Sequence, residues 1–276
     1  ALVDTATITE NTAITLNVMD NDCAFDGAKT VSEVNGDAAN IGLATTGSIG
    51  GSFTINADGS ASFDTGSDFD YLSDGETATT SVTYIIEGYN GENATSTVSV
   101  TVTGINDAPN AVNDARTVNA GFDGLTAQNY AYFGDLRLLS NDSDAEGDAF
   151  AITSVDGQSL VDGSVTVEGS NGGLFTISED GTVHLDASTG FETLAVGETA
   201  ETAISYTVTD ANGASSTATY TVTVNGMNDA VAAIIDTATI TENTAITLNV
   251  MDNDFAFDGD KTVSEVNGDA ANIGLA

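Results

Sequence analysis

The sequence predicts an all-β chain built from tandem β-sandwiches, and three observations support this. Apolar residues alternate with Thr or Ser in stretches such as TATIT (5–9), AITLNV (13–18) and TTSVTYIIE (79–87), as in strands that bury one face. Turn sequences such as NADG and YNG separate these stretches. No stretch has a helical period with caps. About seven or eight short strands per ~110 residues suit a sandwich, and a closed barrel is the alternative.

Domain-length repeats organise the chain. Residues 3–44 return as residues 235–276 with three differences, Val3/Ile235, Cys23/Phe255 and Ala28/Asp260. A weaker repeat pairs GGSFTINADGSASFD (50–64) with GGLFTISEDGTVHLD (172–186). We therefore expect domains at 1–108 and 109–230, and the N-terminal part of a third repeat at 231–276. The third repeat holds too few strands for a sandwich. We expect the sequence to be part of a longer array, and the alternative is that another chain completes the fold.

The composition points to cations as partners. The 276 residues include 42 Asp and Glu but 4 Lys and Arg, a formal charge of −38, while 41% hydrophobic residues can supply a core. Nucleic acid and anionic lipid bind through Lys and Arg, so we expect neither as a partner. No apolar run approaches the ~20 residues of a membrane span, and we expect any export signal to lie outside this sequence. The alternative is an acidic surface kept for solubility.

The densest group of oxygen-bearing side chains is NDSDAEGD at 141–148, with alternating Asp142, Asp144, Glu146 and Asp148. Calcium takes six to eight oxygen ligands and accepts irregular geometry, so it fits this spacing better than magnesium or zinc. An EF-hand is excluded because Thr153 stands at the twelfth position, where that loop needs Glu. The loop therefore supplies part of a site. Shorter equivalents occur at 20–27 and 252–260, with Asp20, Asp22, Asp26, Asp252 and Asp254.

One resemblance covers both complete domains and the partial third. The sequence from GSFTINADGSASFD through GET (75–77) to GINDAP (104–109) resembles the VCBS repeat of giant secreted bacterial adhesins, and its end resembles the NDNAP junction of cadherins. The resemblance implies cadherin-like or immunoglobulin-like Greek-key sandwiches in an elongated tandem surface protein. It also implies type I secretion and calcium at the junctions. The glycine-aspartate nonapeptide of RTX β-rolls is absent from this sequence.

The same resemblance implies two sets of calcium ligands. For the first junction it indicates Glu10, Glu76, Asn106, Asp107, Asp142, Asp144 and Asp210. For the next junction it indicates Glu198, Asn228, Asp229, Asp252 and Asp254. The second domain reads VNAG (118–121) where the first has Glu10, which places the second set in doubt.

These features favour a calcium-stiffened extender of a secreted surface adhesin or filament over an enzyme. His184 is the sole histidine and lies in an alternating stretch, there is no Trp, and Cys23 is Phe255 in the repeat. Two other functions stay open. One is a glycan- or protein-binding module, for which only residues 130–133 hint at a site, and the other is a self-assembling filament or surface-layer subunit.

Overall fold

A computed structural model describes residues 1–23, 27–120, 130–131, 137–187, 190–228, 231–256 and 259–273. Its chain divides into two compact units. The first contains residues 1–109 together with the segments 144–149 and 210–214, and the second contains residues 110–143, 150–209 and 215–276. The predicted all-β class is confirmed, because the described residues form strands and, apart from three short 3₁₀ turns, no helix.

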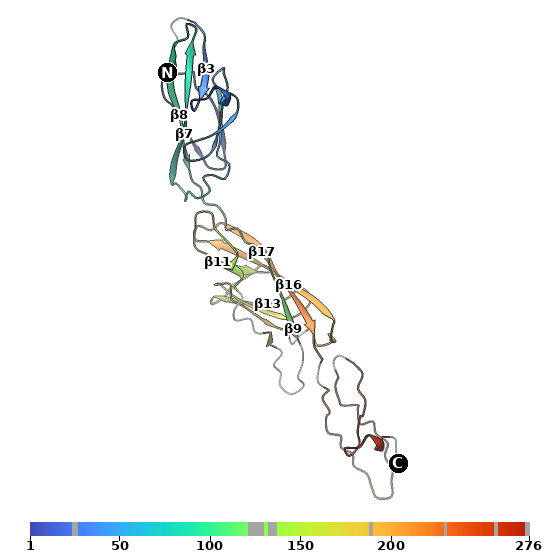
Figure 1. Cartoon of the computed structure of the whole chain (residues 1–276). Coiled ribbons are helices and arrows are strands. Elements are labelled where there is room, and N and C mark those ends of the chain that lie inside the picture. Colours follow the sequence, from blue (N-terminus) through green and yellow to red (C-terminus); the bar gives the residue numbers. More distant parts are fainter. Residues whose placement is uncertain are drawn as a thin grey trace. The chain divides into compact units, whose positions relative to one another are not determined.

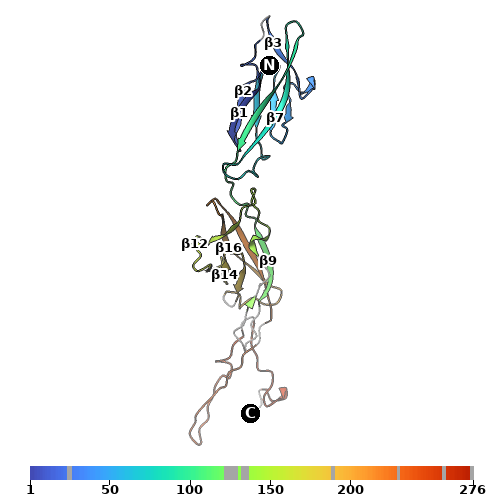
Figure 2. The same ribbon diagram turned by 90° about the vertical axis from the view of Figure 1, so that its left-hand side faces the viewer.

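Two four-stranded sheets make up the first unit (Figures 1 and 2). One has the order β1-β8-β7-β3 and the other the order β2-β6-β5-β4. β1 runs parallel to β8, and the other pairs are antiparallel. The strands are β1 Asp4–Thr9, β2 Ala13–Asn17, β3 Lys29–Val34, β4 Ala44–Thr46, β5 Ser52–Ile55, β6 Ser60–Asp64, β7 Thr77–Gly88 and β8 Asn93–Thr103, with a 3₁₀ turn η1 at Ala38–Asn40.

The second unit repeats this plan in orders β12-β11-β16-β17-β9 and β10-β15-β14-β13. Its first strand, β9, again runs parallel to its last, β17. The elements are β9 Asp114–Ala120, β10 Tyr130–Ala131, β11 Phe150–Val155, β12 Gln158–Ser159, β13 Ser164–Glu168, β14 Leu174–Ser178, β15 Val183–Asp186, β16 Thr199–Asp210 and β17 Ser215–Gly226, with η2 at Leu138–Ser140 and η3 at Ala270–Asn272.

Alternating side chains give each unit its own core. Along β8 every second residue from Ser96 to Val102 is buried, and β17 shows the same alternation. Phe53, Phe63 and Phe69 pack as a ring cluster in the first core, with ring centroids 4.4 and 6.4 Å apart. Phe175 meets Tyr220 edge-on in the second. The predicted period of two therefore marks the faces that pack between the sheets.

The third repeat behaves differently from the first, although residues 7–22 and 239–254 are identical. In the first copy these residues form β1 and β2, which pair with β8 and β6. No strand is present among the described residues of 231–276, and no described segment pairs with them as β8 and β6 pair with the first copy. Val18 is fully buried, whereas its copy Val250 is 45% exposed. Cross-strand partners, more than local sequence, make these strands.

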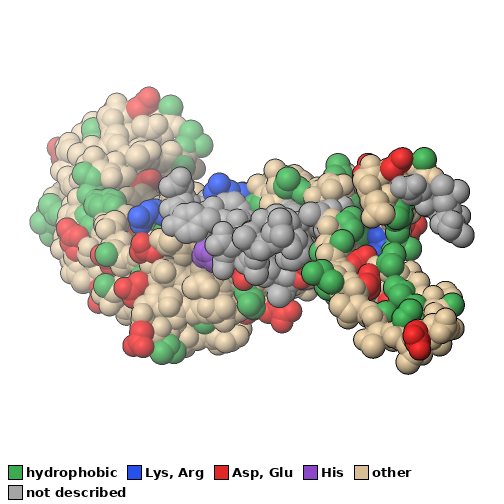
Figure 3. All heavy atoms as spheres, turned by 90° about the horizontal axis from the view of Figure 1, so that it is seen from below, with side chains coloured by type: hydrophobic (Ala, Val, Ile, Leu, Met, Phe, Trp, Pro, Cys, Tyr) green, Lys and Arg blue, Asp and Glu red, His purple; other side chains and the backbone are tan. Residues whose placement is uncertain are grey.

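Acidic side chains are scattered over the surface visible in Figure 3, where basic side chains are few. This agrees with the strong excess of Asp and Glu in the sequence.

Candidate metal centre

The parallel pairing of β1 and β8 brings two predicted acids to one end of the first unit. The register sets Thr9 opposite Thr103, the last residues of the two strands. Glu10 follows β1 directly, and its N–H still donates to the Thr103 carbonyl at 2.9 Å. Asp107 follows β8 after three connecting residues. Parallel strands end at the same edge of a sheet, so both carboxylates lie beyond that edge.

Gly104 lets the chain leave β8 along a path that no other residue could follow unchanged. A Cβ on Gly104 would lie 2.3 Å from the Leu72 carbonyl oxygen and 2.5 Å from that of Ser73. The Gly104 N–H donates to the Glu76 carbonyl at 2.8 Å, which holds the exit against the 73–76 turn. The next N–H, that of Ile105, then donates to Glu10 Oε1 at 2.7 Å. The glycine thus helps to fix both the backbone and the Glu10 carboxylate.

Three carboxylates converge at this edge. Glu10, Asp107 and Glu146 each offer one oxygen, and these oxygens lie within 4.8 Å of one another. Glu146 belongs to the 144–149 segment of the first unit, and its Oε1 accepts the Asp107 N–H at 2.6 Å. This cluster, called the acid triad below, contains one acid that follows β1, one that follows β8 and one from the predicted calcium loop.

Several oxygens around the acid triad are buried without a hydrogen-bond donor. Glu10 is fully buried, yet its Oε2 has no partner. The same holds for Glu146 Oε2, Asp144 Oδ2 and Asp70 Oδ1 within the first unit. A buried acceptor that lacks a donor is costly, so four such oxygens in one region need a positive partner.

Burial and mutual repulsion disfavour the charged forms of the acid triad. Burial raises the pKa of Glu10, opposed by its bond to Ile105 and reinforced by the nearby Asp107, Asp70 and Glu146 charges. Burial likewise raises the pKa of Asp107 and of Glu146. A bound cation would reverse this trend because it stabilises the ionised carboxylates.

An amide network borders the acid triad. The Asn106 side chain donates to Asp210 Oδ2 at 2.8 Å and to the Asp107 carbonyl at 2.9 Å. The Asn212 side chain donates to Asn106 Oδ1 at 2.5 Å and to Asp148 Oδ2 at 2.8 Å. Asp210 is held further by the N–H groups of residues 212–214. The bond from Asn106, followed by these N–H bonds, lowers the pKa of Asp210, which therefore stays ionised.

The donor chemistry fits a hard cation. All the groups described are carboxylate or amide oxygens, with neither thiolate nor imidazole among them, so the set suits calcium or magnesium better than zinc. The unpaired oxygens of Glu10, Glu146, Asp144 and Asp70 are the ones that such an ion would satisfy.

The remaining predicted loop acids cap the segments that precede β1 and β9 and the corresponding segment of the third repeat. The N–H of Leu2 donates to Asp22 Oδ1, that of Val112 to Asp142 Oδ1 at 2.7 Å, and that of Ile234 to Asp254 Oδ1 at 2.7 Å. Asp22 Oδ2 and Asp142 Oδ2 are buried without a donor. Burial raises the pKa of Asp142. These three acids therefore have a local structural role, and Asp22 and Asp142 each keep one oxygen without a donor.

Several other predicted ligands are not members of the acid triad. Glu76 and Glu198 are exposed and accept N–H groups of their own turns, from Ser73 at 3.3 Å and Ala195 at 3.1 Å. Asp252 accepts the Asn249 side chain at 2.6 Å. Asp20 is exposed in the turn after β2, and Asn228 follows β17. Asp26 and Asp229 lie outside the described residues, as does most of the extra sequence at 122–136.

Sequence reasoning missed three residues near the acid triad. Asp70 contributes a buried unpaired oxygen and raises the pKa of Glu10 and Asp107 by its charge. Asn11 has a φ of 58° and bonds Asp107, and Asn212 ties Asn106 to Asp148. Asp70 lies beside the core residue Phe69 in SDFDYL, a pattern that could have drawn attention to it. No sequence signal separates Asn11 or Asn212 from ordinary turn residues.

His184 lies within β15 opposite Thr176, and Cys23 is an exposed free thiol. Among the described residues, no helix has the length and apolar character needed to cross a membrane.

Comparison with known proteins identifies two regions of the chain. Residues 106–226 match the family model of the bacterial cadherin-like domain, and residues 1–103 match that of the bacterial Ig domain. The cadherin-like resemblance is thus confirmed, whereas the VCBS repeat stays a prediction. Neither model describes an enzyme. A search of the curated proteins found no match.

The solved structures that this chain matches include cadherin fragments. A human mucin-like protocadherin fragment, EC1-2, is 16% identical with a TM-score of 0.40, and the match covers 82% of this chain and 96% of that one. A Drosophila N-cadherin fragment, EC1-4, is 14% identical with a TM-score of 0.43, and the match covers 84% of this chain and 50% of that one.

Proposed function

We propose that this chain is a calcium-stiffened extender of a bacterial surface adhesin or filament, because residues 1–103 match the bacterial Ig domain model and residues 106–226 match the bacterial cadherin-like domain model. In this function the segment is extracellular and holds a tip or partner away from the cell. The proposed domains are residues 1–108 and 109–230, with residues 231–276 as part of a third repeat.

The acid triad is the observation that carries this proposal. Glu10 comes from the Ig-matched region, whereas Asp107 and Glu146 come from the cadherin-like match. A calcium ion bound by all three would link residues of both matched regions. The ion would also supply the positive charge that the unpaired oxygens of Glu10 and Glu146 need. Tethering the two regions through a metal would limit the freedom of the residues that connect them.

The remaining predicted acids have graded roles in this proposal. Asp144, Asp148, Asp210 and Asn106 are close enough to one another, through hydrogen bonds, to act as further ligands or to orient them. Asp142 would use its second carboxylate oxygen, which has no hydrogen-bond donor. Glu76 and Glu198 would have to leave their own turns to take part.

The test combines thermal unfolding with solution scattering of the intact chain. A ligand at about 100 times its dissociation constant stabilises a protein by about 2.7 kcal/mol per site, so chelation should lower the melting temperature by several degrees. Chelation should also reduce the maximum dimension seen by scattering. Sodium chloride at matched ionic strength controls for general screening of the −38 charge, and magnesium tests selectivity. Chelation that changes neither quantity would refute the proposal.

A further inference from the structure

The two lysines of the chain stand at one position of the repeat. Lys29 and Lys261 are separated by the 232-residue period, and only Arg116 and Arg137 complete the basic side chains. Each lysine follows an Asp-Asn-Asp turn at 20–22 or 252–254. In a chain with a formal charge of −38, an internal cation placed twice beside the same acidic turn calls for a structural reason.

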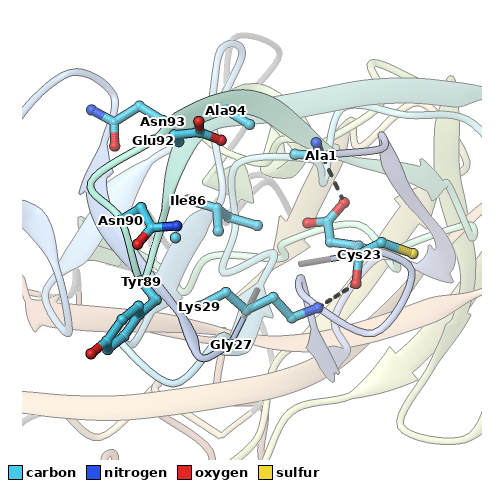
Figure 4. Close-up of a pocket in the computed structure, with 12 residues that line it drawn as sticks. Ala1, Cys23, Gly27, Lys29, Ile86, Tyr89, Asn90, Glu92, Asn93 and Ala94 are labelled. Atoms are coloured by element: carbon cyan, nitrogen blue, oxygen red, sulfur yellow. Dashed lines mark hydrogen bonds and ion pairs between the residues drawn. The ribbon is translucent and has the colours of Figure 1, made fainter. Parts of the chain in front are cut away.

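Both lysines make the same pair of contacts. Lys29 Nζ donates to the Met19 carbonyl at 2.5 Å and to the Asp22 carbonyl. Lys261 Nζ donates to the Met251 carbonyl at 2.6 Å and to the Asp254 carbonyl. Figure 4 shows the Lys29 side chain extending from β3 toward the residues around Cys23, along a cavity of about 210 Å³. The ammonium therefore bridges Met19 and Asp22, or Met251 and Asp254, and we call the segments 19–22 and 251–254 the lysine-held turns.

The turn that receives Lys29 is rich in negative charge. Asp22 is 9% exposed, and its Oδ2 has no hydrogen-bond donor. Asp4 is also buried, and burial raises its pKa, with the charges of Asp22 and Asp20 adding to this effect. An ammonium supplies three donors and a compact positive charge, so it stabilises a turn whose carbonyl oxygens point toward it.

The cadherin-like region has no lysine or arginine at the corresponding place. The corresponding turn there ends at Asp142, and residues 143–155 contain neither residue type. Asp144, Glu146 and Asp148 follow the turn instead. The equivalent strands β7 and β16 also differ at their last residue, which is Gly88 in β7 and the acid Asp210 in β16. The repeat type with Lys29 and Lys261 thus has a lysine beside its turn, whereas the cadherin-like region has additional acids there.

We propose that Lys29 and Lys261 are positioning residues that replace a bound metal as the organiser of the turns at 19–22 and 251–254. The segment 141–149 instead depends on bound calcium for its order, and this second statement rests on the proposed function. Along the chain, calcium would then control the cadherin-like repeat's loop and leave the lysine-held turns unchanged.

Amide hydrogen exchange of the intact chain, measured by mass spectrometry with calcium and with chelator, tests the proposal. Peptides that contain Cys23 or Phe255 distinguish the two otherwise identical turns by mass. We expect chelator to increase exchange in 141–149 at least about tenfold and to leave both lysine-held turns within about twofold. Lys29→Met should raise exchange at 19–22 about tenfold in chelator, since two hydrogen bonds from a charged donor are lost.

The controls are built into the chain. In the Lys29→Met variant the 251–254 turn keeps Lys261 and should not change, and Lys261→Met should give the reverse result. Arg137→Met removes the same charge from an exposed ion pair and should move neither turn. Peptides from β8 report whether the first unit stays folded.

The proposal is overturned if Lys29→Met and Lys261→Met leave their turns unchanged, or if chelator loosens the wild-type turns as much as 141–149. Calcium-independent exchange in 141–149 with a normal Lys29→Met effect would instead overturn only the calcium arm and the proposed function.

Discussion

Replacing Glu10 by Gln should change the stability of the first unit in opposite directions with and without calcium. The Glu10 side chain is fully buried, its Oε1 accepts the Ile105 N–H at 2.7 Å, and its Oε2 has no donor. Gln keeps the size and the accepting oxygen, removes one charge and places an NH₂ donor toward the neighbouring acids. A buried unpaired acceptor costs about 1–3 kcal/mol, so without calcium the variant should be more stable by about that amount.

With calcium the order should reverse. At about 100 times the dissociation constant, wild type gains about 2.7 kcal/mol per site, and a variant that lacks one charged ligand loses much of this gain. Thermal unfolding of wild type and variant, each in chelator and in calcium, gives four melting temperatures. A difference of about 1 kcal/mol in the free energy of unfolding corresponds to roughly 4–8 °C for a domain of this size. Glu87→Gln, an exposed acid on β7, matches the change in charge and should show neither effect. A Glu10→Gln variant that is less stable than wild type in chelator would refute the reasoning.

Burial raises the pKa of Glu10, Asp107 and Glu146, so near these pKa values the folded state binds more protons than the unfolded state. In chelator, lowering the pH from about 7 to about 5 should therefore raise the melting temperature. In calcium titrations the same change of pH should weaken binding, because protons compete with the ion. Gly104→Ala should cost about 1–3 kcal/mol in denaturant unfolding, whereas Gly88→Ala, with its nearest atom at 3.7 Å, should cost less. Tyr206→Phe should cost about 1–3 kcal/mol because the hydroxyl bonds Asp114 at 2.8 Å, while Tyr220→Phe, whose buried hydroxyl is unpaired, should be neutral or stabilising.

Alternation of apolar and polar residues was enough to predict the fold class. In β7 and β8 the buried side chains fall on every second residue, as the sequence pattern indicates. The same pattern gave no warning that residues 236–249 would lack strands, because their sequence equals that of β1 and β2. Pairing with β8 and β6 is a property of distant residues, and a local pattern does not contain it.

The candidate site was predictable where spacing in the sequence reflects chemistry. The alternating acids at 141–148 pointed to Glu146, and the resemblance to cadherins pointed to Glu10, Asn106 and Asp107. Asp70 and Asn212 escaped because their role depends on which loops the fold brings together. Asp70 is about 60 residues from Glu10 in the chain, and only the closing of the two sheets places its charge near that carboxylate.

In the proposed metal centre, Glu10, Asp107 and Glu146 together hold a calcium ion. Calorimetric titration of calcium into the chelator-treated chain tests it most directly, with wild type compared to the Glu10→Gln/Glu146→Gln variant. We predict saturable binding by wild type and the loss of at least about one site in the variant, with the remaining sites unaffected. Equal stoichiometry and equal affinity in the two proteins would contradict the claim.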